Sequence, residues 1–256
     1  MMPSYFFAHG APSLVLEQHA YTDLLKNFAN NIPKPKAIVL FSAHWEESVQ
    51  TVSAVDEYST IYDFGGFQDE LYQMTYPAPG NRPLSEEIRS LFAKHGISSK
   101  LDEKRGLDHG AWAVLKLLYP DADIPVVALS VNRFLSNEQQ YAIGKALSEL
   151  KEKDVLIIGS GGTVHNLRSV NWRANGVDEW AGAFDNWLQQ KLEAWDTASL
   201  FNYRELAPHA AMAVPTSEHF IPLLIAMGAG DARKQAKLLH RSYQYGNLSL
   251  SCWQFD

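Results

Sequence analysis

Short, continuous runs of apolar residues alternate along this chain with segments spaced like amphipathic helices. The runs lack the polar alternation of half-exposed strands, and are typical of parallel strands that helices cover on both faces. We expect strands at about 5–8, 37–41, 49–55, 124–131 and 155–158, helices at about 17–31, 83–95, 110–118 and 136–151, helical pieces over 178–230, and one or two strands over 235–254.

The alternation of strands and helices predicts the α/β fold class, with a mostly parallel central sheet and helices on both of its faces. The chain has 256 residues, and neither an internal repeat nor a linker-like segment divides it. We therefore expect residues 1–256 to form a single catalytic domain. Its 46% hydrophobic and 20% charged residues are ordinary for a soluble globular protein.

Charge and cysteine content exclude several classes of protein. The net charge of -7 argues against nucleic-acid binding, which needs clustered Lys and Arg. Cys252 is the only cysteine, so neither an intramolecular disulfide nor a cysteine-based zinc site can form. No apolar stretch is long enough to span a membrane, and the first residues do not resemble a signal peptide. We expect a cytoplasmic protein, and no pattern indicates its oligomeric state or a partner protein.

Five of the nine histidines stand in short, distinctive words, and four of these words lie where a predicted strand or loop ends. One such histidine alone is more often structural, but this joint pattern is hard to produce by chance. His9, His44 and His165 each follow an apolar strand, and because ligands of open α/β sheets bind beyond the carboxyl ends of the strands, these three side chains should converge there. Imidazole is the commonest protein ligand of transition metals, so we predict a mononuclear metal site at this edge. The words are His9-Gly-Ala-Pro, Ser-Ala-His44-Trp, Leu-Asp-His109-Gly, Gly-Ser-Gly-Gly-Thr-Val-His165-Asn and Ser-Glu-His219-Phe.

Two further segments bear on this site. Residues 58–80 are rich in aromatic residues, glycine and proline, and we interpret them as an ordered loop over a pocket. A surface loop with anchoring aromatic residues is the alternative. The glycines of 159–162 would let the backbone approach a ligand closely. Dinucleotide-binding, P-loop, serine-hydrolase and zincin motifs are all absent from the sequence.

The residues alone therefore indicate an α/β metalloenzyme with a histidine-rich site, which suits zinc, iron, copper or nickel. Two other interpretations stay open. A zinc-dependent hydrolase of an amide or ester would use zinc-bound water as nucleophile and His165 as base. A metal-binding protein without turnover would have no pocket beneath the aromatic segment.

At these same words the chain resembles the class III extradiol ring-cleavage dioxygenases, specifically the 4,5-DOPA dioxygenase-like family. The similar segments extend from residue 9 to about 222, and only their combination is specific. They are residues 9–13, 41–46, 62–72, 76–80, 106–112, 159–167 and 217–220.

The resemblance implies an oxidoreductase that opens the ring of a catechol such as DOPA next to its hydroxyls, using O₂ and Fe(II), to give a muconic semialdehyde. It implies His9, His44 and His219 as metal ligands. Many non-haem iron oxygenases use two histidines and one carboxylate, which would make Glu218 the third ligand, but the resemblance favours His219. An all-histidine site is less anionic and would also accept Zn²⁺.

The remaining two histidines have catalytic roles by the same resemblance. His165 is similar to the acid/base histidine that takes a proton from the catechol and returns it later. In a resting, zinc-loaded protein it could itself be a fourth metal ligand. His109 is similar to the histidine that faces the substrate.

Overall fold

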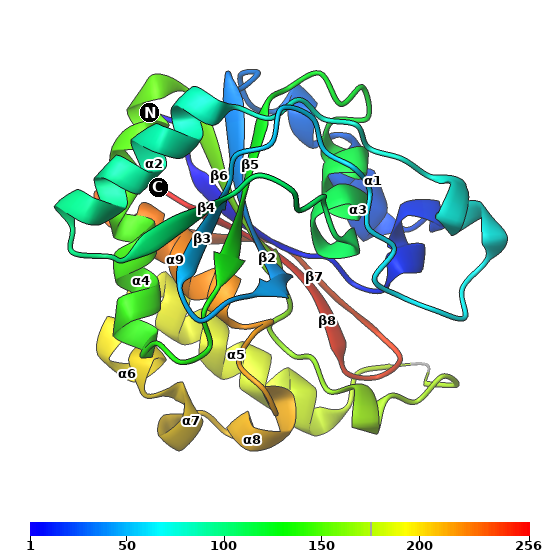
Figure 1. Ribbon diagram of the computed structural model, residues 1–256. Coiled ribbons are helices and arrows are strands. Elements are labelled where there is room, and N and C mark those ends of the chain that lie inside the picture. Colours follow the sequence, from blue (N-terminus) through cyan, green and yellow to red (C-terminus); the bar gives the residue numbers. More distant parts are fainter. Residues whose placement is uncertain (175) are drawn as a thin grey trace.

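The computed structural model describes residues 1–174 and 176–256, and an eight-stranded sheet runs through it in the order β4-β3-β5-β2-β6-β1-β8-β7 (Figure 1). Pairs β1–β6, β2–β6, β2–β5 and β3–β4 are parallel, whereas β3–β5, β1–β8 and β7–β8 are antiparallel. The predicted α/β class with a mostly parallel sheet is confirmed. The strands are β1 (Ser4–Ala8), β2 (Ala37–Glu46), β3 (Gln50–Ser53), β4 (Ser99–Asp102), β5 (Val126–Val131), β6 (Val155–Gly161), β7 (Ala236–Gln244) and β8 (Leu248–Phe255).

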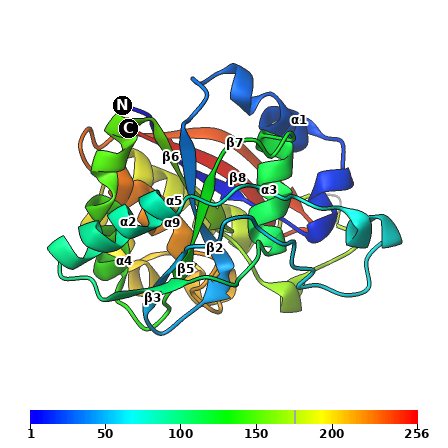
Figure 2. The same cartoon turned by 45° about the horizontal axis from the view of Figure 1, so that its top comes forward.

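Helices cover both faces of the sheet, as predicted. They are α1 (Ala20–Lys26), α2 (Arg82–Lys94), α3 (His109–Leu118), α4 (Asn137–Ala146), α5 (Glu179–Glu193), α6 (Thr197–Phe201), α7 (Tyr203–Leu206), α8 (Ala210–Ala213) and α9 (Ile221–Ala229). Strand β2 shows how the layers form, because its alternate side chains enter different cores. Ile38 and Leu40 pack with α1 and α3, whereas Val39 and Phe41 pack with α2, α4 and α9. Figure 2 shows α1 and α3 on one side of the sheet and α2, α4 and α9 on the other.

Helices α4 and α9 pack backbone against backbone on the second face. A methyl group on Gly144 would lie 1.8 Å from the carbonyl oxygen of Ile225, and one on Gly228 would lie 2.0 Å from that of Tyr141. Only glycine allows this approach at either position. The close packing holds α9, and with it the residues just before α9, against the sheet.

Two local predictions need correction. The helix expected at 17–31 is only α1, between 3-10 turns at Pro12–Leu16 and Phe28–Asn30. Its start is set by a capping box between His19 and Thr22, which the apolar spacing did not reveal. Strand β4 was not predicted, because its four residues are mostly polar and only partly buried at the sheet edge.

The other elements lie close to their predicted positions. The region 178–230 is helical in pieces, α5 to α9, and the last segment forms the hairpin of β7 and β8. Within the described ranges, no helix combines the length and the apolar character that crossing a bilayer requires.

Candidate metal centre

Five histidines meet at the carboxyl edge of the parallel strands. His9 follows β1, His44 lies near the end of β2, His109 begins α3, His165 follows β6, and His219 lies just before α9. Ring centroids are 4.8 Å apart for His9 and His44, 4.1 Å for His44 and His109, and 3.6 Å for His165 and His219. The structure thus brings together every histidine that the sequence singled out.

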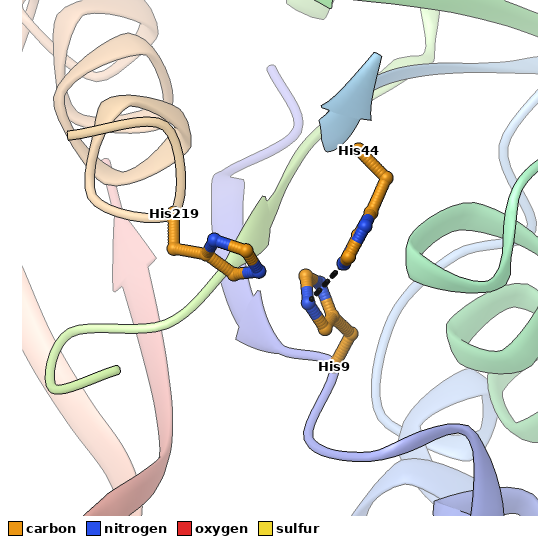
Figure 3. A group of neighbouring side chains, drawn as sticks. All are labelled: His9, His44 and His219. Atoms are coloured by element: carbon orange, nitrogen blue, oxygen red, sulfur yellow. Dashed lines mark hydrogen bonds between the residues drawn. The ribbon is translucent and has the colours of Figure 1, made fainter. Parts of the chain in front are cut away.

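Three of these imidazoles point toward one another (Figure 3). His9, His44 and His219 each offer a ring nitrogen, and the three nitrogens lie within 4.8 Å of one another. The Nε2 atoms of His9 and His44 are 3.1 Å apart. Three nitrogen donors from three separate elements, grouped at this spacing, could hold one transition-metal ion.

In His9 and His219, a hydrogen bond at Nδ1 decides which ring nitrogen is free to bind a metal. Ser160 donates its hydroxyl proton to the carbonyl oxygen of Gly110, so its oxygen accepts from Nδ1–H of His9 at 3.1 Å. Nδ1–H of His219 donates to Glu218 Oε1 at 3.0 Å. Each ring therefore keeps an Nε2 lone pair toward the centre, the arrangement in which outer partners orient metal-binding histidines.

Glu218 lies behind His219. Its Oε1 also accepts from the Thr216 hydroxyl at 2.8 Å. Burial favours the neutral acid, but the hydrogen bonds from His219 and Thr216 outweigh it and hold the pKa of Glu218 at about 2. Among the described residues, the buried Nε2 of His219 has no hydrogen-bond partner. A buried, unpaired nitrogen is costly, and a metal ion would satisfy it.

Asp63 joins the site, although sequence reasoning missed it. Its Oδ1 accepts from both the backbone N–H and Nδ1–H of His109, each at 2.9 Å, and its Oδ2 lies 3.4 Å from Nδ1 of His44. Burial opposes its charge, but the hydrogen bond from His109 lowers the pKa of Asp63 to about 2. The only signal in the sequence was an acidic residue within the aromatic segment.

Asp108 fixes the helix that carries His109. It caps the N-terminus of α3, accepting from the backbone N–H of Ala111. The same carboxylate accepts from the Ser42 hydroxyl at 2.6 Å and from Arg105 at 3.1 Å. Strand β2 and helix α3 are thereby locked together beside the site.

His165 stacks on His219 with an angle of 8° between the ring planes. Burial and the neighbouring His219 lower the pKa of His165 to about 3, and burial with His109 and His219 lowers that of His44 to about 2. Burial and the same cluster also lower the pKa of His9. The imidazoles of His9, His44 and His165 are therefore neutral near pH 7, so protons do not compete with a metal for these three rings.

The sequence suggested that the glycines at the end of β6 let the backbone approach a ligand. In the structure they let it approach the backbone of a neighbouring segment instead. A methyl group on Gly159 would lie 2.1 Å from the carbonyl oxygen of Pro222, and one on Gly161 would lie 2.1 Å from that of His219. The backbone N–H of Gly162 donates to the same oxygen of His219 at 2.9 Å. These glycines thus let the segment that carries His219 lie against the strand.

A cavity of about 770 Å³ opens beside the histidines. His44, His109, His165 and His219 line its inner end, and the aromatic segment contributes Phe64, among others, to its wall. The predicted pocket beneath that segment is present. Other aromatic residues of the segment, Tyr58 and Tyr76, are instead buried in the core. The volume is in the range of small-molecule sites.

Comparison with known proteins gives the family of this chain. The family model described as the catalytic LigB subunit of aromatic ring-opening dioxygenase matches residues 4–252. The chain belongs to this family. The match includes all five histidine words and almost the whole sheet.

Similar proteins carry a consistent name. The 4,5-DOPA dioxygenase extradiol of Beta vulgaris is 42% identical over 256 residues, covering 98% of this chain and 96% of the relative. The protein of the same name from Escherichia coli (strain K12) is 36% identical over 255 residues, covering 97% and 93%. A crystal structure of an uncharacterized protein from Escherichia coli K12 matches with a TM-score of 0.86 and 32% identity, covering 100% of both chains.

The protein is therefore an oxidoreductase, an extradiol aromatic ring-opening dioxygenase. This result decides between ring opening and the zinc-dependent hydrolysis that the residues alone had left open. Membership of the family also implies a catalytic metal, an aromatic substrate and O₂.

Proposed function

We propose that this protein opens the ring of a catechol such as DOPA with O₂, using one Fe(II) ion held by His9, His44 and His219. The observation that carries the proposal is the grouping of three imidazole nitrogens within 4.8 Å, one of them buried and unpaired among the described residues. Glu218 is a poorer candidate for the third ligand, because its Oε1 is bound to Nδ1 on the far side of the His219 ring and the group of close ligand atoms contains His219 and not Glu218, although Glu218 Oε2 also has no partner among the described residues.

When bound, Fe(II) supplies the redox chemistry that allows O₂ to react with an aromatic ring. Both oxygen atoms enter the product, and the carbon–carbon bond beside one hydroxyl breaks. One of the two carbons becomes an aldehyde and the other a carboxylic acid, which gives a muconic semialdehyde. No external reductant is needed, since the catechol itself supplies the electrons.

Two histidines around the cavity would handle the substrate protons. His109 donates Nδ1–H to Asp63, so its Nε2 can accept a hydrogen bond from a catechol hydroxyl. His165 lines the same cavity, so its imidazole is placed to take a hydroxyl proton and later return it. Phe64, whose ring lies 5.7 Å from that of His109, would form an apolar wall beside the aromatic substrate.

Zn²⁺ would compete with Fe(II) for this site. A set of three neutral nitrogen ligands suits both ions, and Zn²⁺ prefers four-coordinate, tetrahedral sites. His165, stacked beside His219, would then be the fourth nitrogen ligand. Purified protein is therefore expected to contain zinc unless iron is supplied.

Labelled oxygen tests the proposal. The apo-protein is reconstituted with Fe(II) without air and mixed with L-DOPA and heavy-oxygen-labelled O₂, with L-tyrosine as the control that lacks one hydroxyl. Mass spectrometry should find two labelled oxygen atoms in each ring-opened product and no reaction of L-tyrosine. His44→Ala should lose both metal and turnover. One labelled atom in a hydroxylated, unopened product would contradict the proposal.

A further inference from the structure

The cavity is larger than a catechol ring requires. Its volume of about 770 Å³ lies in the upper part of the range for small-molecule sites, whereas a catechol has only eight non-hydrogen atoms. If the two hydroxyls lie at the histidines, the rest of the cavity accepts a substituent on the ring. Lining residues other than the histidines therefore select that substituent.

Arg168 is the only Lys or Arg among the described residues that line this cavity. It lies in a 3-10 turn, Leu167–Ser169, three residues after His165. Asn166 fixes that turn, because its side chain accepts from the backbone N–H of Arg168 at 3.1 Å and donates to the carbonyl oxygen of Met212 at 2.8 Å. The position of Arg168 is thus tied to the segment that carries His165.

The guanidinium of Arg168 has no partner within the described part of the protein. Within residues 1–174 and 176–256 it makes no hydrogen bond or ion pair, whereas Arg82, Arg105 and Arg241 all bind side-chain oxygens. Leu167 and Trp172, also at the cavity, are 66% and 75% exposed, so this part of the lining is open to solvent. An unpaired guanidinium at the open part of an apolar cavity is suited to hold an anionic group of a ligand.

Acidic residues that line the same cavity make a positive charge on Arg168 more important for binding an anionic substrate. The carboxyl groups of Asp63 and Glu218 also line the cavity, and the whole chain carries a net charge of -7. An anionic substrate is repelled by these charges unless a cation offsets them. Besides the metal ion that the proposed function places at the histidines, Arg168 is the one side chain in the described lining with a permanent positive charge.

We infer that Arg168 binds a carboxylate of the substrate, so that the enzyme selects catechols whose side chain ends in a carboxylate over neutral or cationic catechols. This inference rests on the proposed function, since it assumes that the catechol hydroxyls lie at the histidines. The planar guanidinium can pair with both carboxylate oxygens, which a lysine ammonium cannot do as well.

The test compares catechols with and without a carboxylate on the ring substituent. L-DOPA and dopamine form one pair, and 3-(3,4-dihydroxyphenyl)propionate and 4-methylcatechol add an acid without the amine and a neutral catechol. Steady-state kinetics are measured for wild type, Arg168→Met, Arg168→Lys and the control Arg173→Met. Arg173 is nearby and exposed but does not line the cavity, so its replacement removes the same charge without the proposed contact.

Arg168→Met should raise KM for both acids roughly tenfold, the lower part of the range for a charge-assisted hydrogen bond, because the site is partly exposed. KM for dopamine and 4-methylcatechol, and kcat for all substrates, should change little. Arg168→Lys should be intermediate. Equal losses for acids and neutral catechols, or the same loss in Arg173→Met, would overturn the inference.

The two proposals fail in different ways. If wild type turns over none of the catechols, the proposed function is wrong. Calorimetric titration of the Zn²⁺-loaded protein with 3-(3,4-dihydroxyphenyl)propionate and 4-methylcatechol then tests Arg168 without turnover. A preference for the acid that disappears in Arg168→Met supports the inference, and a preference that is absent or unchanged contradicts it.

Discussion

Replacing Asp63 by Asn tests how the loop carboxylate prepares the metal site. Asn keeps one acceptor oxygen, which can stay with His109, but places an amide N–H₂ beside Nδ1 of His44. His44 is then favoured in the tautomer with its hydrogen on Nε2, which removes the lone pair that faces His9. Loss of such an outer partner typically costs 10- to 100-fold in metal affinity.

The geometry indicates the lower part of that range. The distance from Asp63 Oδ2 to Nδ1 of His44 is 3.4 Å, which is longer than a good hydrogen bond. The contact is therefore mainly an electrostatic interaction between the carboxylate charge and the imidazole dipole. The side chain of Asp63 is 22% exposed, so solvent also weakens the contact. We expect metal affinity to fall about tenfold, equivalent to about 1.4 kcal/mol. Asp63→Ala, which also frees both N–H groups of His109, should lose more.

Competition with a chromophoric chelator measures this affinity for Zn²⁺ and, without air, for Fe(II). Asp69→Asn is the matched control, because Asp69 lies in the same segment and is exposed, outside the cavity lining. At saturating metal, Asp63→Asn should keep most of its kcat, since the oxygen that orients His109 is retained. Unchanged metal affinity in Asp63→Asn, or an equal loss in Asp69→Asn, would refute the reasoning.

Three further predictions concern catalysis and stability. His165→Ala should lose turnover at least 100-fold, in line with loss of a general acid/base, but bind Fe(II) within a few-fold of wild type; near-normal turnover would remove His165 from the mechanism. Lys151 is fully buried, its ammonium donates to the carbonyl oxygen of Ala229 at 3.1 Å, and burial lowers its pKa from 10.5 to about 8. Because the folded pKa lies below the unfolded one, the charge destabilises the fold below about pH 8, and this cost of about 3 kcal/mol disappears as the pH rises toward about 10.5. Urea unfolding should therefore show Lys151→Met more stable than wild type near neutral pH, with the difference shrinking above about pH 8; a difference independent of pH would contradict this. Gly144→Ala should destabilise the protein by several kcal/mol, about 3 or more, because its methyl group would lie 1.8 Å from the carbonyl oxygen of Ile225; a free energy of unfolding within about 0.5 kcal/mol of wild type would refute that.

The parts of the fold that follow from burial were predictable. The runs at 37–41 and 155–158 are apolar on every residue, because they become β2 and β6, which are covered on both faces. Strand β4 was not predictable in this way, because its edge position leaves it polar. The histidines could be grouped before the structure was known, since parallel strands place their carboxyl ends at one edge.

The contacts that orient those histidines were not predictable. Asp63 reaches His44 and His109 from a loop with no regular period, so only the tertiary structure brings them together. Ser160 was visible in the sequence only as part of a glycine-rich word, yet its hydroxyl sets the tautomer of His9. Distance in space, rather than spacing along the chain, determines both roles.

Oxygen consumption tests the central claim most directly. The apo-protein is reconstituted anaerobically with either Fe(II) or Zn²⁺, and O₂ uptake is recorded after addition of L-DOPA. The account predicts one O₂ consumed per L-DOPA and a yellow semialdehyde product with Fe(II), with no uptake for Zn²⁺ or for the His44→Ala variant. Tight binding of Fe(II) with no O₂ uptake after addition of any catechol would contradict the account.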